Sequence, residues 1–476
     1  MGNLEELLGI EYDVVVVGAG VAGSALAAVL GRDGRKVLVI ERDLSEQHRI
    51  VGELLQPGGV QQLEKLGLMD AVEGIDAQHV YGYGLFLQTR NPLCIDYSKE
   101  VQDSTVDSSA GISGRSFHNG RFVQRLRTIA DAEENVTMIQ GNVLGLVKDS
   151  KAERVSGVRF RVENGSEHEA RGKLTIACDG CASRLRKEVA PASAYDVSSH
   201  FVGLILETVD LPFPNHGHVI LCDRAPVLFY PISSTEVRCL VDVPASAGIS
   251  SSREYLEQQI LPQLPKELKE PFAKALTSDR LKSMPNRVMP AMPGNQPGAI
   301  LLGDSFNMRH PLTGGGMTVA LSDIVLVREM LKSVERLDDT VKISAGLEKF
   351  YESRKARSST INILANALYA VFCATDDASL QEMREACYDY LGMGGRCSND
   401  PMCMLGGLSA SPILLLVHFF AVAVYGCGRV LLPFPTPGKL WNSWSLFRAA
   451  FNIVKPLIDA ERVTPLSWIP FSRIAI

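Results

Sequence analysis

Three glycines near the N-terminus have a spacing that can bring phosphate groups close to the backbone. Gly18, Gly20 and Gly23 follow the β-branched run 12-YDVVVV-17, which predicts a buried parallel strand. In such a loop the first glycine permits a tight turn, the second lets a pyrophosphate approach, and the third lets helix and strand pack closely. The helix expected to follow would offer free N–H groups and a partial positive charge. The stretch therefore predicts a dinucleotide-binding site.

One acidic residue indicates which dinucleotide is bound. Glu41 follows a second apolar run, 36-KVLVI-40, at roughly the distance from the glycines that a ribose-binding acid has. A carboxylate there accepts hydrogen bonds from ribose hydroxyls and repels a 2′-phosphate, which favours FAD or NAD over NADP. The complete strand, glycine, helix, strand and acid unit is much more specific than the glycines alone, which are frequent in ordinary turns.

Two later stretches favour FAD over NAD. The first, 174-LTIACDGCASRLRKEV-189, carries Asp179, and the second, 301-LLGDSFNMRHPLTGGGMTVALSDI-324, carries Asp304 and three consecutive glycines. Such glycines would let a flat ring lie against the main chain, and a helix from Met317 would place its positive end near a reduced ring. A flexible loop would explain the glycines but not Asp304. The three segments together resemble the fingerprints of single-component flavoprotein monooxygenases of the para-hydroxybenzoate hydroxylase type.

Longer stretches resemble the squalene epoxidase (squalene monooxygenase) family. Among them are 49-RIVGELLQPGGVQQLEKLGL-68, 115-RSFHNGRFVQRLR-127 and 361-INILANALYAVFCATDD-377. The resemblance implies that squalene and O2 are converted to (S)-2,3-oxidosqualene in sterol and triterpenoid biosynthesis. It also implies electrons from NADPH through a separate NADPH-cytochrome reductase, and a location at the cytosolic face of the endoplasmic reticulum membrane. Reduced flavin would supply an electrophilic oxygen, so a dry, apolar cavity is expected rather than a nucleophile or a metal.

Candidate site residues come from the motifs and from the resemblance. The resemblance implies that Tyr83 and Gln56 lie beside the flavin and the substrate, and we expect them to be hydrogen-bond partners because a buried phenol needs one. From the sequence alone, a packing role for Tyr83 would be the better reading. The residues expected to bind FAD are Gly18, Gly20, Val21, Ala22, Gly23, Glu41, Arg42, Arg49, Leu54, Arg127, Val143, Asp179, Asp304, Gly315, Gly316 and Met317.

The elements that must position these residues predict an α/β fold. We expect a discontinuous Rossmann-like FAD domain from residues 8–60, 115–190 and 290–330, and a β-sheet substrate domain from 61–114 and 191–289. Residues 331–476 are expected to form a helical, membrane-associated region. Apolar stretches such as 201-FVGLILETV-209 and 226-PVLFYPI-232 are candidates for the cavity wall, although each also fits an ordinary core strand.

The C-terminal region predicts monotopic association with membrane lipid. The uncharged run 412-PILLLVHFFAVAVYG-426 is about 15 residues long, short of the roughly 20 needed to span hydrocarbon. Trp441, Trp444 and Trp468 suit a membrane interface. A buried core helix is the alternative. We expect that deleting the chain from about residue 410 would leave flavin binding intact.

Other classes of function fit the sequence less well. A net charge of −6 disfavours nucleic-acid binding. The ten cysteines have no framework spacing, and we expect Cys178 and Cys181 to flank Asp179 without forming a redox pair or a metal site. Two alternatives remain: an FAD-dependent reductase of a polyprenyl lipid, similar to geranylgeranyl reductase, and a non-enzymatic prenyl-binding escort on the same fold.

Overall fold

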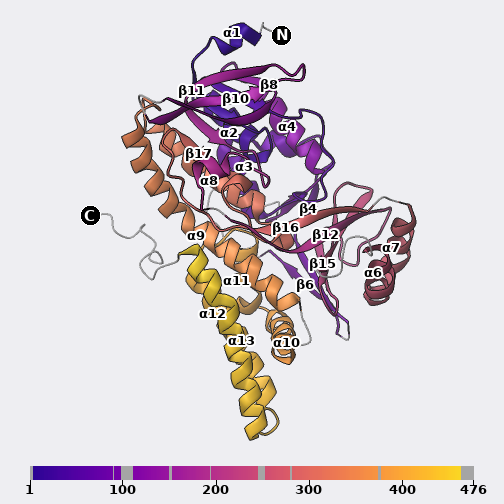
Figure 1. Cartoon of the computed structure of the whole chain (residues 1–476). Coiled ribbons are helices and arrows are strands. Elements are labelled where there is room, and N and C mark those ends of the chain that lie inside the picture. The colour runs from indigo at the N-terminus through magenta and orange to yellow at the C-terminus, as the bar shows by residue number, and fades with distance from the viewer. Residues whose placement is uncertain are drawn as a thin grey trace.

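The computed structural model describes residues 4–88, 90–97, 111–149, 153–192, 194–244, 252–278, 281–373 and 377–462. It contains a Rossmann-like α/β part, a second β-sheet and a C-terminal set of helices (Figure 1). The expected fold class is confirmed. Trp468 lies outside the described residues.

The first sheet forms the core of the FAD domain. Its strand order is β8 (Val136–Gln140), β2 (Val37–Glu41), β1 (Tyr12–Val17), β11 (Glu167–Ala177), β10 (Arg154–Arg161) and β9 (Asn142–Asp149), and β17 (Ala299–Leu301) pairs with β11. The first half of β11 pairs antiparallel with β10, and its second half pairs parallel with β1 and β17. Parallel strands covered on both faces require nearly continuous apolar runs, which explains the valines of β1.

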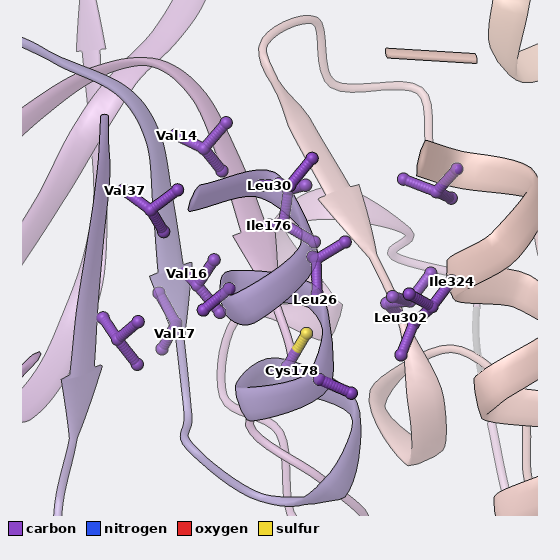
Figure 2. Packing of buried hydrophobic residues seen from close by; sticks show 14 of the residues in the cluster. Val14, Val16, Val17, Leu26, Leu30, Val37, Ile176, Cys178, Leu302 and Ile324 are labelled. Carbon is purple, nitrogen blue, oxygen red and sulfur yellow. The ribbon is translucent and has the colours of Figure 1, made fainter. Parts of the chain in front are cut away.

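Helices cover this sheet and carry the motifs. They include α2 (Val21–Arg32), α4 (Asn119–Asp131) and α8 (Gly316–Lys332), while α1 (Leu4–Leu8) and α5 (Arg186–Val189) are short. Figure 2 shows Val16, Leu26 and Leu30 between β1 and α2, with Leu302 and Ile324 on the other part of the same core.

Helix α3 (Pro57–Leu66) lies with the FAD domain. It packs against α8, and Leu63, Leu66 and Leu68 belong to the same buried cluster as β1 and β2. We therefore propose a domain boundary near residue 75 in place of the expected boundary at 60, because an amphipathic helix follows the partner that buries its leucines.

The second sheet separates two apolar layers. Its order is β16 (Lys282–Val288), β12 (Asp196–Glu207), β15 (Glu236–Pro244), β14 (Pro226–Pro231), β13 (Gly217–Leu221), β5 (Gly82–Leu87) and β6 (Leu93–Asp96). One face packs on α7 (Lys266–Ser278), near the short α6 (Ser252–Tyr255), and the other face packs on the C-terminal helices. A small sheet of β3 (Leu54–Leu55), β7 (Gly114–Ser116) and β4 (Gln78–Val80) adjoins both parts.

The described part of the chain beyond residue 331 is helical, as expected. It forms α9 (Thr340–Phe372), α10 (Ala378–Gly392), α11 (Arg396–Leu405), α12 (Pro412–Leu431) and α13 (Pro437–Glu461). Helices α12 and α13 pair as a hairpin that extends away from the α/β part (Figure 1, yellow).

Helix α12 is longer than expected. It has 20 residues rather than about 15, and by length and composition it is apolar enough to cross a membrane. The uncharged run 412–426 is therefore only part of this helix, and Gly426 lies inside it in a helix contact: a Cβ there would be 3.1 Å from the Ala386 Cβ. Glycine weakens a helix without ending it when close packing compensates.

Candidate functional site

The three glycines after β1 differ in what surrounds them. Gly18 has a φ of +96°, and a Cβ on it would lie 2.6 Å from the Cys178 carbonyl oxygen. A Cβ on Gly23 would lie 1.8 Å from the Gly18 oxygen. A Cβ on Gly20 would meet no heavy atom of the described chain within 4 Å. The protein itself therefore requires the first and third glycines, and the second leaves open the space that a pyrophosphate needs.

Glu41 and Arg127 hold the backbone around this loop. Glu41 ends β2, and its Oε2 accepts a hydrogen bond from Ala19 N at 2.6 Å. Arg127 Nε donates to Ala19 O at 2.8 Å, and its Nη atoms donate to the carbonyls of Ser45 and Asp43, each at 3.2 Å. Burial lowers the pKa of Arg127, and the charges of Glu41 and Asp43 oppose this shift. The Arg127 donors shown here thus bind protein carbonyls, so its proposed role toward FAD is indirect.

The other expected FAD contacts from the N-terminal half are dispersed. Arg42 and Arg49 are exposed, and the charge of Arg49 also lowers the pKa of Arg127. Leu54 lies in β3, while Val143 is buried in the core of the α/β part. Val21 and Ala22 form the first turn of α2, next to the glycines. Contact of these residues with FAD stays a prediction.

The two aspartate motifs are joined by a residue that the sequence reasoning did not select. Arg186 Nε donates to Ser305 O at 2.8 Å, and its Nη2 donates to Asp304 O at 3.0 Å and to Cys181 O at 3.1 Å. One planar guanidinium thus ties together two segments that are far apart in the chain. Arg186 stood in the second motif, but no local signal indicated this long-range contact.

The aspartates themselves have unused acceptor atoms. Asp179 Oδ2 accepts from Arg184 N at 3.0 Å, whereas its buried Oδ1 has no hydrogen-bond partner among the described residues. Asp304 is exposed. These two carboxylates could therefore accept hydrogen bonds from hydroxyl groups of a ligand.

The three consecutive glycines, Gly314, Gly315 and Gly316, differ in their backbone conformation and in what surrounds them. Gly314 has a φ of +62° and ends a 3₁₀ turn over Pro311–Thr313. A Cβ on Gly315 would lie 2.4 Å from Ile361 Cγ2 of α9, so helix packing also requires this glycine, and its contact with FAD stays a prediction. A Cβ on Gly316 would have Arg309 Nη1, at 3.6 Å, as its nearest neighbour. The open space at Gly20 and the free acceptor atoms of Asp179 and Asp304 fit an FAD molecule, and Met317, next to Gly316, is buried.

An apolar cavity lies next to this turn. Its walls come from β5, β6, β13 and the helices α9 to α13, with Leu312 and Thr313 at the turn. The expected stretches 201–209 and 226–232 do not line the cavity in the described structure. They form strands whose buried side chains belong to the hydrophobic core. The sequence reasoning missed the walls, which include Leu85, Ile95, Val219, Ile363, Leu368, Phe372, Met383, Leu391, Met404, Leu415, Phe419, Val422 and Val454.

Tyr83, which lines the cavity, and Gln56, bonded to it behind the wall, form the polar corner of the cavity. Gln56 Nε2 donates to Tyr83 Oη and to Thr313 O, both at 2.6 Å, so the expected contact is present. Tyr97, which the sequence reasoning missed, donates its hydroxyl to Gln56 Oε1. These three bonds fix the orientation of the amide, because a flipped amide would face Thr313 O with its own oxygen. Burial raises the pKa of Tyr83 to about 12, so its hydroxyl keeps its proton.

A buried ion pair supports the segment that carries Gln56. Arg238 of β15 donates from Nε and Nη2 to the two carboxylate oxygens of Glu53, at 2.7 and 2.8 Å. Both side chains are buried. Such a bidentate pair fixes geometry and is costly to break from one side.

Two other clusters lie outside this site. Cys178 is buried, and burial raises the pKa of its thiol, while none of the ten cysteines forms a disulfide. Cys178 and Cys181 are therefore not a disulfide. No metal site was expected, but ligand atoms of Cys94, Asp96 and His216 lie within 4.8 Å of one another. Cys94 and Asp96 are exposed and alternate with the cavity residue Ile95, so they face away from the cavity.

Comparison with known proteins places this geometry in one family. A family described as squalene epoxidase matches residues 171–442, and an NAD(P)-binding Rossmann-like domain matches residues 16–45. A squalene monooxygenase of Panax ginseng is 53% identical over 96% of this chain and 83% of its own length. Squalene epoxidase 1 of Arabidopsis thaliana is 52% identical over 95% of this chain and 84% of its own length. The squalene monooxygenase of Mus musculus is 44% identical over 94% of this chain and 78% of its own length.

Solved structures with low sequence identity share the fold. The p-nitrophenol 4-monooxygenase of Pseudomonas putida has a TM-score of 0.67 at 17% identity, covering 85% of this chain and 99% of its own. The flavin-dependent brominase Bmp2 has a TM-score of 0.67 at 17% identity, covering 87% of this chain and 99% of its own. The near-full-length identity to the curated relatives shows that this chain belongs to the squalene epoxidase family.

Proposed function

We propose that this protein is an FAD-dependent monooxygenase that transfers one oxygen atom of O2 to squalene. Family membership supports this activity. The observation that carries it is the apolar cavity whose polar corner, Tyr83 and Gln56, adjoins the Gly314 turn. A hydrocarbon has no hydrogen-bonding groups, so apolar walls must bind and orient it.

The residues of this chain have separable tasks in that reaction. Bound FAD would supply the activated oxygen, held at Gly20, Gly316, Asp179 and Asp304. The cavity walls exclude water and place the end of the hydrocarbon at the polar corner. Tyr83 Oη accepts from Gln56, and the Tyr97 hydroxyl is a second hydrogen-bond partner, so the Tyr83 side chain is held at the cavity wall. Gln56 couples the Tyr83 hydroxyl to the turn through Thr313 O.

The test of the activity uses purified protein with squalene, NADPH and an NADPH-cytochrome reductase. We expect oxidosqualene only when O2 is present, and we propose that the separate reductase is required. Formation of a saturated polyprenyl product without O2 would instead support the reductase alternative. Full activity with NADPH alone would refute the need for a separate electron donor.

We further propose that the α12–α13 hairpin binds membrane lipid, at the cytosolic face of the endoplasmic reticulum. Large apolar side chains are exposed along it, and the same helices line the cavity, so squalene would enter from the lipid. The exposed residues are Ile413, Val417, Val424, Leu432, Phe434, Leu440, Trp441, Trp444 and Phe451.

Vesicle flotation tests this binding. We expect Trp441→Ser combined with Trp444→Ser to reduce the vesicle-bound fraction, because indole rings favour the interface. Val341→Ser, at a side chain exposed 77% on α9, is the control and should not change it. Equal flotation of all three proteins would contradict the assignment. Deleting residues from about 410 is not a clean test: it removes Leu415, Val422 and Val454 from the cavity wall.

A further inference from the structure

A buried arginine lies beneath the proposed flavin turn and binds the first residue of α8. Arg309 Nη1 donates to Gly316 O at 3.3 Å, Nε donates to Asn362 Oδ1 at 2.7 Å, and Nη2 donates to Asn307 Oδ1 at 2.7 Å. Arg309 is buried. Its guanidinium therefore links the start of α8 to the middle of α9.

The charge of Arg309 has no direct counter-ion. Among the described residues, no carboxylate lies within 4.0 Å of its guanidinium nitrogens. The nearby Asp323 is already engaged by Arg354, with two hydrogen bonds of 2.9 Å. An uncompensated buried charge is costly, so a second acid should lie close by.

Besides Asp304 and Asp323, one acid reaches this network through hydrogen bonds: Glu461, the last residue of α13. Glu461 Oε1 accepts from Asn362 Nδ2 at 2.8 Å, and Oε2 accepts from Ser359 Oγ at 3.1 Å. The amide of Asn362 thus joins Glu461 to Arg309. Burial raises the pKa of Glu461, while hydrogen bonds and the charges of Arg354 and Arg309 lower it. Burial lowers the pKa of Arg309, and the charges of Asp304, Asp323 and Glu461 oppose this shift, Asp304 most.

We propose that Glu461 is a positioning residue for the flavin turn, acting through Asn362 and Arg309 on the start of α8. This inference rests on the proposed function. Helix α13 packs on both α12 and α9. The packing of the α12–α13 hairpin on α9 therefore brings the carboxylate of Glu461 to Asn362. Glu461 balances Arg309 and so limits the positive charge that a reduced flavin would experience.

The test uses variants that separate the effect of the Glu461 charge from the effect of its side-chain shape. Glu461→Gln keeps an amide oxygen that can accept from Asn362 but loses the charge. We expect its bound FAD to favour the reduced state by up to about tenfold, a positive potential shift of about 30 mV for two electrons. Glu461→Asp should keep the wild-type potential. Asp459→Asn is the matched control, since Asp459 lies on the same helix and, among the described residues, its carboxylate pairs with the exposed Lys455 alone.

The outcomes distinguish this inference from the proposed function. An unchanged potential in Glu461→Gln, with normal flavin binding in the wild type, would overturn the role of Glu461 alone. A wild-type protein that binds no flavin would overturn the proposed function together with it. If Glu461→Gln does not fold, Ser359→Ala tests the same carboxylate by removing one of its hydrogen bonds. That variant should shift the potential in the same direction, and no shift would refute the inference.

Discussion

Replacing Tyr83 by phenylalanine removes one oxygen atom and keeps the ring in the cavity wall. Gln56 Nε2 then loses one of its two acceptors, Tyr83 Oη at 2.6 Å, and keeps Thr313 O. An unpaired buried amide hydrogen costs about 1–3 kcal/mol. If this cost falls on the transition state, turnover decreases roughly 5- to 150-fold. FAD content should stay near that of the wild type, because Tyr83 lies outside the three FAD motifs.

The assay measures oxidosqualene formed and hydrogen peroxide released per NADPH consumed. We expect less epoxide and more peroxide from the Tyr83→Phe enzyme, because the hydroxyl that bonds to Gln56 and holds this part of the cavity wall is lost. Tyr351→Phe is a control, since the Tyr351 hydroxyl accepts from Gly294 N at 3.3 Å and does not line the cavity. A full epoxidation rate with normal coupling in Tyr83→Phe would reduce Tyr83 to a packing residue.

A double-mutant cycle tests whether Tyr83 and Tyr97 act through the same amide. Tyr97→Phe removes the donor to Gln56 Oε1. Residues in one hydrogen-bond network show interaction energies of about 0.5–3 kcal/mol. We therefore expect the double variant to lose less activity than the product of the two single effects. Strict additivity would show that Gln56 does not couple them.

Three other variants test the supporting structure. Glu41→Ala should weaken FAD binding by about 1.5–3 kcal/mol, measured by flavin fluorescence titration; an unchanged Kd would argue against ribose binding. Arg186→Lys should lower both FAD content and melting temperature, because a lysine cannot replace the planar donor set that joins the two aspartate motifs. Burial raises the pKa of Asp242 from 3.8 to about 6, so the folded protein holds an extra proton between these pH values. Its unfolding free energy should therefore fall by up to about 3 kcal/mol as pH rises through this window. Asp242→Asn should flatten that slope in urea unfolding of the apoprotein, and an identical slope would refute the assignment.

The FAD motifs could be predicted because their causes are local. Gly18 needs its positive φ, and Gly23 is in contact with Gly18 only five residues away. The helix and strand that follow are fixed by apolar runs that any covered parallel sheet requires. The apolar run of β2 ends at Glu41, so the position of this carboxylate at the end of the strand could also be predicted.

The cavity and its polar corner depend on long-range packing and could not be read from local patterns. Leu415 and Val454 belong to apolar helices whose partners are not encoded nearby. Tyr97 reaches Gln56 only because β6 pairs with β5 in a register that places Asp96 opposite Gly82. The close packing of Gly315 on Ile361 could not be predicted either, because Ile361 belongs to α9, a helix that begins well after this glycine.

The most direct test of the central claim is incubation with squalene, reductase and NADPH under ¹⁸O2, with the product identified by mass spectrometry. The proposed function predicts oxidosqualene that carries one ¹⁸O atom, and no product when O2 is withheld. An oxygen atom derived from water, or a product that forms without O2, would contradict it.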